Sequence, residues 1–268
     1  MSALLAISVG NTRTSFARFV DRKLIATEHI ENTQENKIVD GIAAAWAELS
    51  DSDAIVVLAS VNDTFANPLK IKIEIRLKTE VLRIGKELPV PIGVCLDAGA
   101  TPGQDRLLAA AAAYDSLKQA VVVVDAGTAM TVDFVDGEGV FHGGAIIPGA
   151  SLQLKSLHEN TAALPRVAFA QPDPKEPFGR NTASAMLLGV YEGLRGAMHR
   201  LVERYAEHYK AFPMVVVTGG DADVLFADDD LVDRHVADLV LIGIRVAAEK
   251  SIEEDSHDTN ASIDAHEE

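Results

Sequence analysis

Four short runs of apolar residues along the chain have the pattern of buried β-strands. Each run is rich in valine, leucine, isoleucine or alanine, and each is too short for an ordinary helix. The predicted strands span Ala3–Val9, Ala54–Ser60, Ala120–Asp125 and Met214–Thr218.

Further strand patterns follow the first and the third of these runs. Thr14–Val20 and Lys23–His29 come after the first run and are separated by turn residues. Ala129–Val135 and Gly139–His142 come after the third, with Asp136–Gly137 as the turn. The layout of a strand, a polar glycine-containing turn and further strands therefore occurs twice.

Helical patterns lie between these groups of strands. The longest repeats apolar residues at intervals of three and four, which indicates one buried stripe and fits a core or subunit-packing helix as well as an active-site helix. The predicted helices span Ile38–Leu49, Gln104–Leu117, Ala150–Asn160, Ala183–Tyr209 and His235–Lys250. The alternation predicts an α/β fold with two similar lobes, residues 1–117 and 118–250.

The composition is that of a globular protein, and the cysteine content indicates a reducing compartment. The chain has 268 residues, 48% of them hydrophobic, and a mean hydropathy of +0.11. No apolar run reaches the roughly 18 residues of a membrane span, and the apolar N-terminus lacks the features of a signal peptide. The single cysteine, Cys95, excludes an internal disulfide, so we expect a cytoplasmic protein without membrane association.

Negative charge dominates the chain and is concentrated at its end. The formal net charge of −16 argues against nucleic-acid binding, which requires basic surfaces. Residues 251–268 hold seven acidic residues and neither Lys nor Arg. Such a segment buries little apolar surface, so we predict that it is disordered.

Three glycine turns follow predicted strands and have the chemistry of phosphate-binding loops. The first spans Ser8–Thr14, the second Asp125–Thr128 and the third Thr218–Gly220. Glycine lets a phosphate approach the backbone, while Asn, Thr and free N–H groups donate hydrogen bonds to it. The first turn alone fits an ordinary hairpin equally well. All three in this order describe the actin-like ATPase layout, in which two loops hold phosphates and the third flanks adenosine.

Asp105 is the candidate general base. It lies with Arg106 in the first turn of the predicted helix Gln104–Leu117, directly after Thr101–Gly103. Acidic residues are common there because they interact favourably with the helix dipole, so a structural role remains open. In the functional interpretation Asp105 accepts a proton from a substrate hydroxyl and Arg106 binds an anionic group.

An ordered set of motifs resembles the type III pantothenate kinases, the group related to the Bvg accessory factor. The resemblance extends from about residue 3 to residue 225. Its motifs are Gly10–Thr12, Gly103–Arg106, Asp125–Thr128, Gly143–Gly149, Leu164–Pro165, Gly179–Thr182 and Thr218–Gly220.

This resemblance implies ATP-dependent phosphorylation of pantothenate, the first committed step towards coenzyme A. It implies a homodimer whose pantothenate pocket lies near the subunit interface, a monovalent cation (K⁺ or NH₄⁺), and Mg²⁺ with the ATP. The implied ATP-binding residues are Gly10, Asn11, Thr12, Arg13, Thr14 and Thr128. The implied substrate-binding residues are Gly103, Gln104, Arg106 and Thr182. Asp105 is the implied base, and Asp125 the implied ligand of the monovalent cation.

Two departures from the family pattern keep other functions open. Ser8 stands where the family has an aspartate that orients the divalent metal, and a serine hydroxyl carries no charge. Residues Cys95–Gly99 contain no aromatic residue, although the family has one there in the pantothenate pocket. The alternatives are a catalytically weak homologue with a binding or regulatory role, and a kinase for another small hydroxylated metabolite. His142 and His158 are interpreted as structural.

Overall fold

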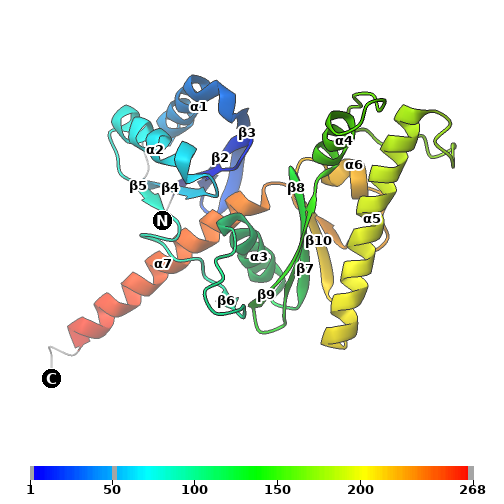
Figure 1. The fold of residues 1–268 in the computed structure, drawn as a ribbon. Helices are drawn as coiled ribbons and strands as arrows, with labels where there is room; N and C mark the ends of the chain where they lie inside the picture. Colours follow the sequence, from blue (N-terminus) through cyan, green and yellow to red (C-terminus); the bar gives the residue numbers. More distant parts are fainter. Residues whose placement is uncertain (1–2, 50–52, 265–268) are drawn as a thin grey trace. The chain divides into compact units, whose positions relative to one another are not determined.

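The computed structural model describes residues 3–49 and 53–264, with side chains described as far as Glu253 (Figure 1). The chain divides into two compact units. Unit 1 consists of residues 1–92, 99–115 and 238–268, and unit 2 of residues 93–98 and 116–237. The predicted boundary after residue 117 lies close to one of the crossings. The predicted simple division into two consecutive lobes is wrong, because the chain also crosses at residues 93, 99 and 238.

Unit 1 is built on a five-stranded sheet of order β3-β2-β1-β4-β5. The central strand β1 pairs antiparallel with β2 and parallel with β4. Alternate residues of β1 enter two different apolar clusters, one with Leu5 and Ile7 and the other with Leu4 and Ala6. Burial on both faces explains why this strand is a continuous apolar run. The strands are β1 (Ala3–Val9), β2 (Arg13–Val20), β3 (Lys23–Glu31), β4 (Ala54–Ser60) and β5 (Val81–Arg83).

Helices cover both faces of the unit 1 sheet. The short helix η1 (Asn32–Gln34) leads into α1 (Glu35–Ala47), which with α2 (Asp63–Leu77) covers the face that carries Leu5 and Ile7. The helix α3 (Gln104–Leu117) and α7 (Leu239–Asp264) contribute to the cluster on the opposite face. Figure 1 shows α1 and α2 together on one side of these strands.

The last helix differs from the prediction in its position and its length. α7 packs on the sheet of unit 1, and a Cβ atom at Gly243 would clash with the backbone of Leu108 in α3. It was predicted to belong to the C-terminal lobe, and that prediction is wrong. The helix also continues to Asp264, so the predicted disorder from residue 251 is wrong as far as residue 264. Extending a packed helix adds one hydrogen bond per residue, and Arg22 pairs with Glu249 and Glu253. Residues 265–268 lie outside the described residues.

Unit 2 repeats the strand order of unit 1. Its six-stranded sheet has the order β11-β10-β7-β8-β9-β6, in which β9-β8-β7-β10-β11 matches the five strands of unit 1. The repeat confirms the predicted class, an α/β protein with two similar units, as the predicted actin-like ATPase (ribonuclease H-like) superfold requires. The strands are β6 (Gly93–Val94), β7 (Val121–Ala126), β8 (Ala129–Val135), β9 (Val140–Pro148), β10 (Met214–Thr218) and β11 (Arg234–His235).

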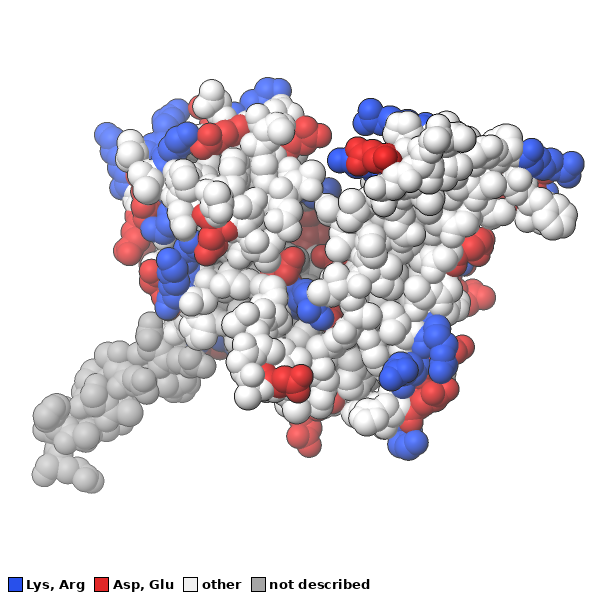
Figure 2. Space-filling model, viewed as in Figure 1, with Lys and Arg blue, Asp and Glu red and all other residues white. Residues whose placement is uncertain are grey.

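The long helix α5 (Thr182–Tyr209) forms the core of unit 2 together with the sheet. Its buried residues Val190, Leu194 and Met198 belong to the same apolar cluster as the valines of β7 and β10. A capping box of Asn181 and Ser184 begins the helix. Unit 2 also contains α4 (Ala150–Glu159) and the short α6 (Ala222–Phe226). Figure 2 shows basic and acidic side chains gathered over the C-terminal end of α5.

Among the described residues, no helix has the length and apolar character needed to cross a membrane.

Candidate active site

The first glycine turn joins β1 to β2 and is fastened by one side chain. The amide of Gly10 donates to the carbonyl of Arg13 (3.0 Å). Asn32, which begins η1, donates from Nδ2 to the carbonyls of Gly10 (2.9 Å) and Asn11 (3.3 Å). Asn11, Thr12 and Arg13 are exposed. The turn is therefore held from one side while its outer face stays open to solvent.

Thr14 supports this turn from inside the unit. The residue is fully buried, and its hydroxyl donates to Asn32 Oδ1 (2.8 Å). The amide of Asn32 in turn donates to the carbonyl of Thr12 (2.9 Å). The side chain of Thr14, expected at the ATP phosphates, thus acts through Asn32. Sequence reasoning missed Asn32, because no local pattern links it to a turn some 20 residues earlier in the chain.

Ser8 lies near the carboxyl end of β1 and is half-buried. Side chains alternate along a strand, so Ser8 shares the sheet face of Leu4 and Ala6. This is the face on which α3 and α7 pack. The position at which the family has an aspartate is therefore on the same side of the sheet as the helix that begins at Gln104.

Asp105 lies in the first turn of α3, and its carboxylate is close to the backbone of Gly103 and Arg106. The amide of Arg106 donates to Asp105 Oδ1 (2.8 Å), and both residues are half-buried. A Cβ atom at Gly103 would come within 2.5 Å of the same carboxylate oxygen. Glycine at position 103 thus leaves room for the carboxylate, which explains the spacing of the Gly-x-Asp-Arg motif.

Gln104 fastens the start of α3 to the sheet. Its Nε2 donates to the carbonyl of Ile84 (3.0 Å), and its Oε1 accepts from the amide of Ser60 (3.4 Å). Gly85 has a positive φ of 80°, and a Cβ atom there would clash with the Gln104 carboxamide. Both ends of the carboxamide are therefore engaged by the backbone of unit 1, which gives Gln104 a positioning role that the sequence did not indicate.

These residues of unit 1 meet at one end of its sheet. The amide of Val61, directly after β4, donates to the carbonyl of Val9 at the end of β1 (3.1 Å). A Cβ atom at Gly103 would contact the side chain of Val61 at 3.7 Å. The first turn and the segment 103–106 are thus connected through the ends of β1 and β4. Such a carboxyl edge is where open α/β sheets bind ligands.

The second glycine turn joins β7 to β8 in unit 2 and packs closely against other backbone. Gly127 donates to the carbonyl of Ala129 (3.1 Å), and Gly149 donates to the carbonyl of Thr128 (3.0 Å). A Cβ atom at Gly149 would clash with the carbonyl of Gly127. Thr128 is exposed. The glycine at the end of the Gly143–Gly149 motif is therefore required by the second turn.

The third glycine turn lies beside Asp125. Gly219 has a φ of 99°, and a Cβ atom there would clash with the carbonyl of Ala126 and come within 2.5 Å of Asp125 Oδ1. Asp221 donates from its amide to the carbonyl of Ala126 (2.9 Å). Two motifs that are far apart in the sequence, Asp125–Thr128 and Thr218–Gly220, therefore meet at the half-buried carboxylate of Asp125.

Asp125 has the surroundings of a ligand for a hard cation. It pairs in register with Thr131 of β8 and Thr218 of β10, so the side chains of these two threonines share its face of the sheet. Oxygen donors are those that K⁺ and Mg²⁺ prefer. Within the described ranges no group of three or more His, Cys, Asp or Glu could hold a metal.

Thr182 is the first residue of α5 and is exposed. A Cβ atom at Gly179 would clash with Ala185, so the preceding segment folds closely against the first turn of the helix. Thr182 thus belongs to unit 2, whereas Gly103, Gln104 and Arg106 belong to unit 1.

Comparison with known sequences identifies relatives over almost the whole chain. The sequence model of the family described as type III pantothenate kinase matches residues 4–204. A type III pantothenate kinase of Rhodospirillum rubrum is 34% identical over 252 residues, covering 91% of this chain and 96% of the relative. One of Paramagnetospirillum magneticum is 33% identical, covering 90% and 95%. The family match includes the first two turns, residues 103–106 and Thr182.

Two solved structures share the fold at low sequence identity. A putative Baf family transcriptional activator from Campylobacter jejuni is 20% identical, with a TM-score of 0.59 over 93% of this chain and 99% of the other. The ethanolamine utilization protein EutJ from Carboxydothermus hydrogenoformans is 12% identical, with a TM-score of 0.54 over 91% and 89%. These similarities support the fold alone.

Proposed function

The chain belongs to the type III pantothenate kinase family, and on this premise we propose that it transfers the γ-phosphoryl group of ATP to a hydroxyl of pantothenate. The product is 4′-phosphopantothenate, the first intermediate on the route to coenzyme A. The observation that carries the proposal is the grouping of the first turn, Ser60–Val61 and Gly103–Arg106 at one end of the unit 1 sheet.

Unit 1 supplies the proton acceptor and the contacts to the acidic substrate. Asp105 takes the proton of the attacking hydroxyl, whose oxygen bonds to the γ-phosphorus as the bond to the bridging oxygen of ADP breaks. Arg106 pairs with the pantothenate carboxylate, and Gly103 leaves space beside Asp105. Gln104 holds the helix in place. Phosphoryl transfer depends mainly on positioning, so this rigid support is part of the catalysis.

We assign the contacts to the ATP phosphates to residues of the exposed glycine turns, each taken within its own unit. In this proposal Gly10, Asn11 and Thr12 present backbone and side-chain donors, and Arg13 adds a positive charge at the same exposed turn. Thr128 gives a further hydroxyl from the second turn.

Asp125 and Thr182 complete the roles proposed for unit 2. Asp125 would hold the potassium ion, which supplies positive charge near the phosphates. The side chain of Thr182, at the N-terminus of α5, hydrogen-bonds to pantothenate.

We also propose that the protein acts as a cytoplasmic homodimer. Unit 2 exposes several large apolar side chains, which is typical of surfaces that a second subunit covers. They are Ile146, Leu152, Leu157 and Phe178. Sedimentation analysis tests this part, and a single monomeric species at micromolar concentration would contradict it.

A second candidate function rests on Ser8. Without a carboxylate at that position, the protein is a weak kinase that acts mainly by binding pantothenate or ATP. The absence of an aromatic residue in Cys95–Gly99 favours, as a further alternative, a kinase for another small hydroxylated acid or sugar.

A coupled ADP-release assay with ATP, magnesium and potassium tests these functions. We expect turnover with pantothenate, and none with pantothenate replaced by sugars or other hydroxy acids. Turnover with one of those instead would favour the other kinase, and pantothenate binding without turnover would favour the weak homologue.

Replacing potassium by sodium should slow the reaction in wild type but not in Asp125→Asn. Equal wild-type rates in both salts would remove the potassium role of Asp125 and leave the kinase proposal standing.

A further inference from the structure

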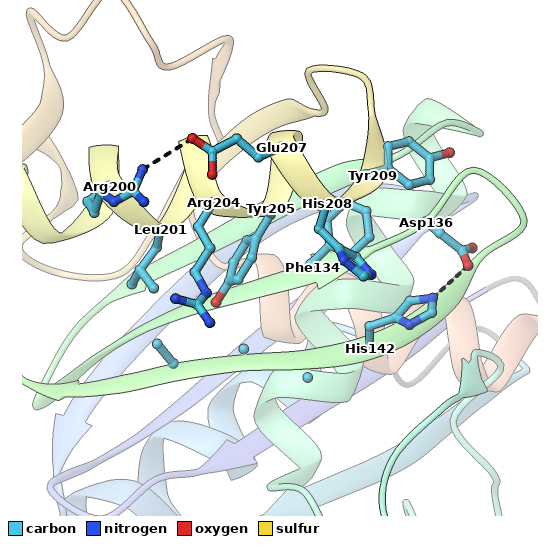
Figure 3. A pocket seen from close by; sticks show the side chains of 13 residues that line it. Phe134, Asp136, His142, Arg200, Leu201, Arg204, Tyr205, Glu207, His208 and Tyr209 are labelled. Atoms are coloured by element: carbon cyan, nitrogen blue, oxygen red, sulfur yellow. Dashed lines mark hydrogen bonds and ion pairs between the residues drawn. The ribbon is translucent and has the colours of Figure 1, made fainter.

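A groove in unit 2 lies outside the residues assigned to the kinase reaction. It has a volume of about 960 Å³ and is formed by the C-terminal half of α5 and the hairpin of β8 and β9 (Figure 3). This volume is that of a small-molecule site. Its lining includes Phe134, His142, Arg200, Arg204, Tyr205 and His208.

The groove is at the opposite end of unit 2 from the second turn and Thr182. Arg200 lies 18 residues after Thr182 on one continuous helix, which corresponds to about 27 Å along the axis. Likewise β8 begins beside the second turn at Ala129 and reaches the groove only at Phe134, near its other end. A ligand here would not touch the residues of unit 2 that bind ATP or pantothenate in the proposed function.

Basic side chains of α5 recur along the groove at intervals of four residues. Arg200, Arg204 and His208 therefore share one face of the helix. Figure 3 shows the guanidinium group of Arg204 pointing into the groove, towards the strand β9. Among the described residues Arg204 has no hydrogen-bond or ion-pair partner, which stands out in a chain of net charge −16.

Arg200 lines the rim of the groove, and Figure 3 shows its guanidinium group directed towards Glu207, so it reaches a ligand only by leaving that pair. It pairs with Glu203 (3.3 Å) and Glu207 (3.5 Å), and these raise its pKa, with the hydrogen bond to Glu203 as the main cause. The side chains of all three residues are more than half exposed. Exposed ion pairs of this kind are weak, so a doubly charged anion can compete with the two glutamates for the guanidinium group.

Aromatic rings form the apolar wall of the groove. The ring of Phe134 lies 6.0 Å from Tyr205, 5.2 Å from Tyr209 and 5.8 Å from His142, measured between centroids. Gly143 and Gly144 line the groove without side chains, and the Cβ position of Gly144 is occupied by the backbone of β8 at Val132 and Asp133. The groove thus combines a flat apolar wall with basic groups on one side.

His142 is held in place by Asp136. Its Nε2 lies 2.7 Å from Asp136 Oδ2. Partial burial acts to raise the pKa of Asp136, but hydrogen bonds with His142 and with the amides of Val140 and Glu138 outweigh it, and the pKa is lowered. The carboxylate therefore stays ionised at neutral pH and fixes the imidazole at the edge of the groove.

We infer that this groove binds a small organic phosphate that carries a flat apolar group. The phosphate lies against Arg204 with Arg200 and His208 close by, and the flat group lies on Phe134 and Tyr205. Two guanidinium groups suit a doubly charged phosphate better than a single carboxylate. The site is additional to the proposed kinase function and does not depend on it.

Phenyl phosphate is the simplest probe of this class, because it joins a doubly charged phosphate to one aromatic ring. Its binding to the full chain is followed by the NMR shifts of the backbone amides of Gly137 and Gly144, which report on the groove. The amide of Gly127 reports separately on the second turn. We expect phenyl phosphate to move the groove amides at lower concentration than either inorganic phosphate or phenol.

Arg204→Ala should weaken this binding roughly tenfold or more, since a hydrogen bond to a charged group contributes about that much. Lys155→Ala removes one positive charge from α4 of the same unit, outside the groove, and should leave binding unchanged. Arg204→Gln keeps a long polar side chain and replaces the alanine variant if that variant fails to fold.

Several results would overturn the inference. Phenyl phosphate could leave Gly137 and Gly144 unmoved, or bind equally well to wild type and the Arg204 variants. Equal binding of phenol would remove the phosphate from the inference, and equal binding of inorganic phosphate would remove the flat group. A change of oligomeric state in Arg204→Ala, without any shift by phenyl phosphate, would make the groove a subunit contact instead.

Discussion

The glycine turns after β1 and β7 occupy the same place in the same strand order, but they are held in different ways. The first is fastened by a side chain, since Asn32 donates to the carbonyls of Gly10 and Asn11. The second is held by close backbone packing, for which Gly149 and Gly219 are needed. A shared topology thus determines where a glycine turn lies, while its support differs between the two units.

The turns also differ in charge at equivalent positions. Ser8 and Asp125 each precede a turn glycine by two residues, and each is paired with both neighbouring strands. Only unit 2 has a carboxylate at this position. In the proposed kinase, Asp125 is therefore the one of these two residues whose charge would attract a cation, because Ser8 is neutral.

The largest expected effect lies outside both turns, at Asp105. Asp105→Asn should lower turnover by roughly 10²–10⁴, the usual contribution of a general base, while the protein stays folded. Asp115→Asn, near the other end of α3, removes an equivalent charge from the same helix and should leave turnover unchanged. Steady-state kinetics and a melting curve for each variant are the measurements. Unchanged turnover in folded Asp105→Asn would assign the base to another residue.

Exchanging a turn glycine for alanine tests the difference in support. Gly219→Ala should destabilise the protein by about 3 kcal/mol, because its positive φ disfavours alanine and the new Cβ clashes with backbone. Gly10→Ala places its Cβ 3.1 Å from the carbonyl of Arg13 without such a φ, and should cost about 1 kcal/mol or less. Urea unfolding of both variants measures the difference. An equal decrease in the free energy of unfolding of both variants would show that the two turns are equally tightly packed.

Removing the side-chain support tests the first turn directly. Asn32→Ala leaves the buried hydroxyl of Thr14 without its acceptor and should destabilise the protein by about 2 kcal/mol. It should also raise the KM for ATP more than it lowers kcat, because the turn loses its anchor. Asn160→Ala at the end of α4 is the control, since that side chain bonds only to its own helix and is exposed. A normal KM in folded Asn32→Ala would separate Asn32 from ATP binding.

The smallest effect is expected from Ser8→Asp, which gives the first turn a carboxylate at the position that corresponds to Asp125. Ser8→Asp adds a carboxylate near Asp105, so without ligand the melting temperature should fall by about 2–4 °C for each kcal/mol of repulsion. Magnesium-ATP should then raise it more than in wild type, and turnover should increase. The comparison requires saturating pantothenate and a magnesium series. Slower turnover in Ser8→Asp, with wild type already an efficient kinase, would mean that the site has adapted to serine and that the protein is not the weak homologue.

The central strands and several helices could be predicted from the sequence because their patterns are strong. The strands β1, β4, β8 and β10 and the helix α3 have the predicted bounds. The helix α2 was missed, since it is polar and contains Pro68, although its N-cap Asn62 was a usable signal. The strand β9 was predicted too short, because Gly143–Gly144 interrupts its apolar pattern.

The remaining features depend on contacts that no local pattern reveals. The placement of α7 in unit 1 follows from the packing of Gly243 on Leu108, between residues far apart in the sequence. The same holds for Asn32 beneath the first turn and for Gln104 between β4 and Ile84. The site motifs themselves were readable, because each is short and continuous in the sequence.

The proposed function is tested most directly by following the γ-phosphoryl group itself. The wild-type protein is incubated with γ-radiolabelled ATP, pantothenate, magnesium and potassium, and the labelled products are separated. We predict that label appears on pantothenate in equal amount to the ADP formed, and that Asp105→Asn slows this transfer. Label found only in inorganic phosphate, or no ADP at all, would contradict the assignment of a pantothenate kinase activity to this chain.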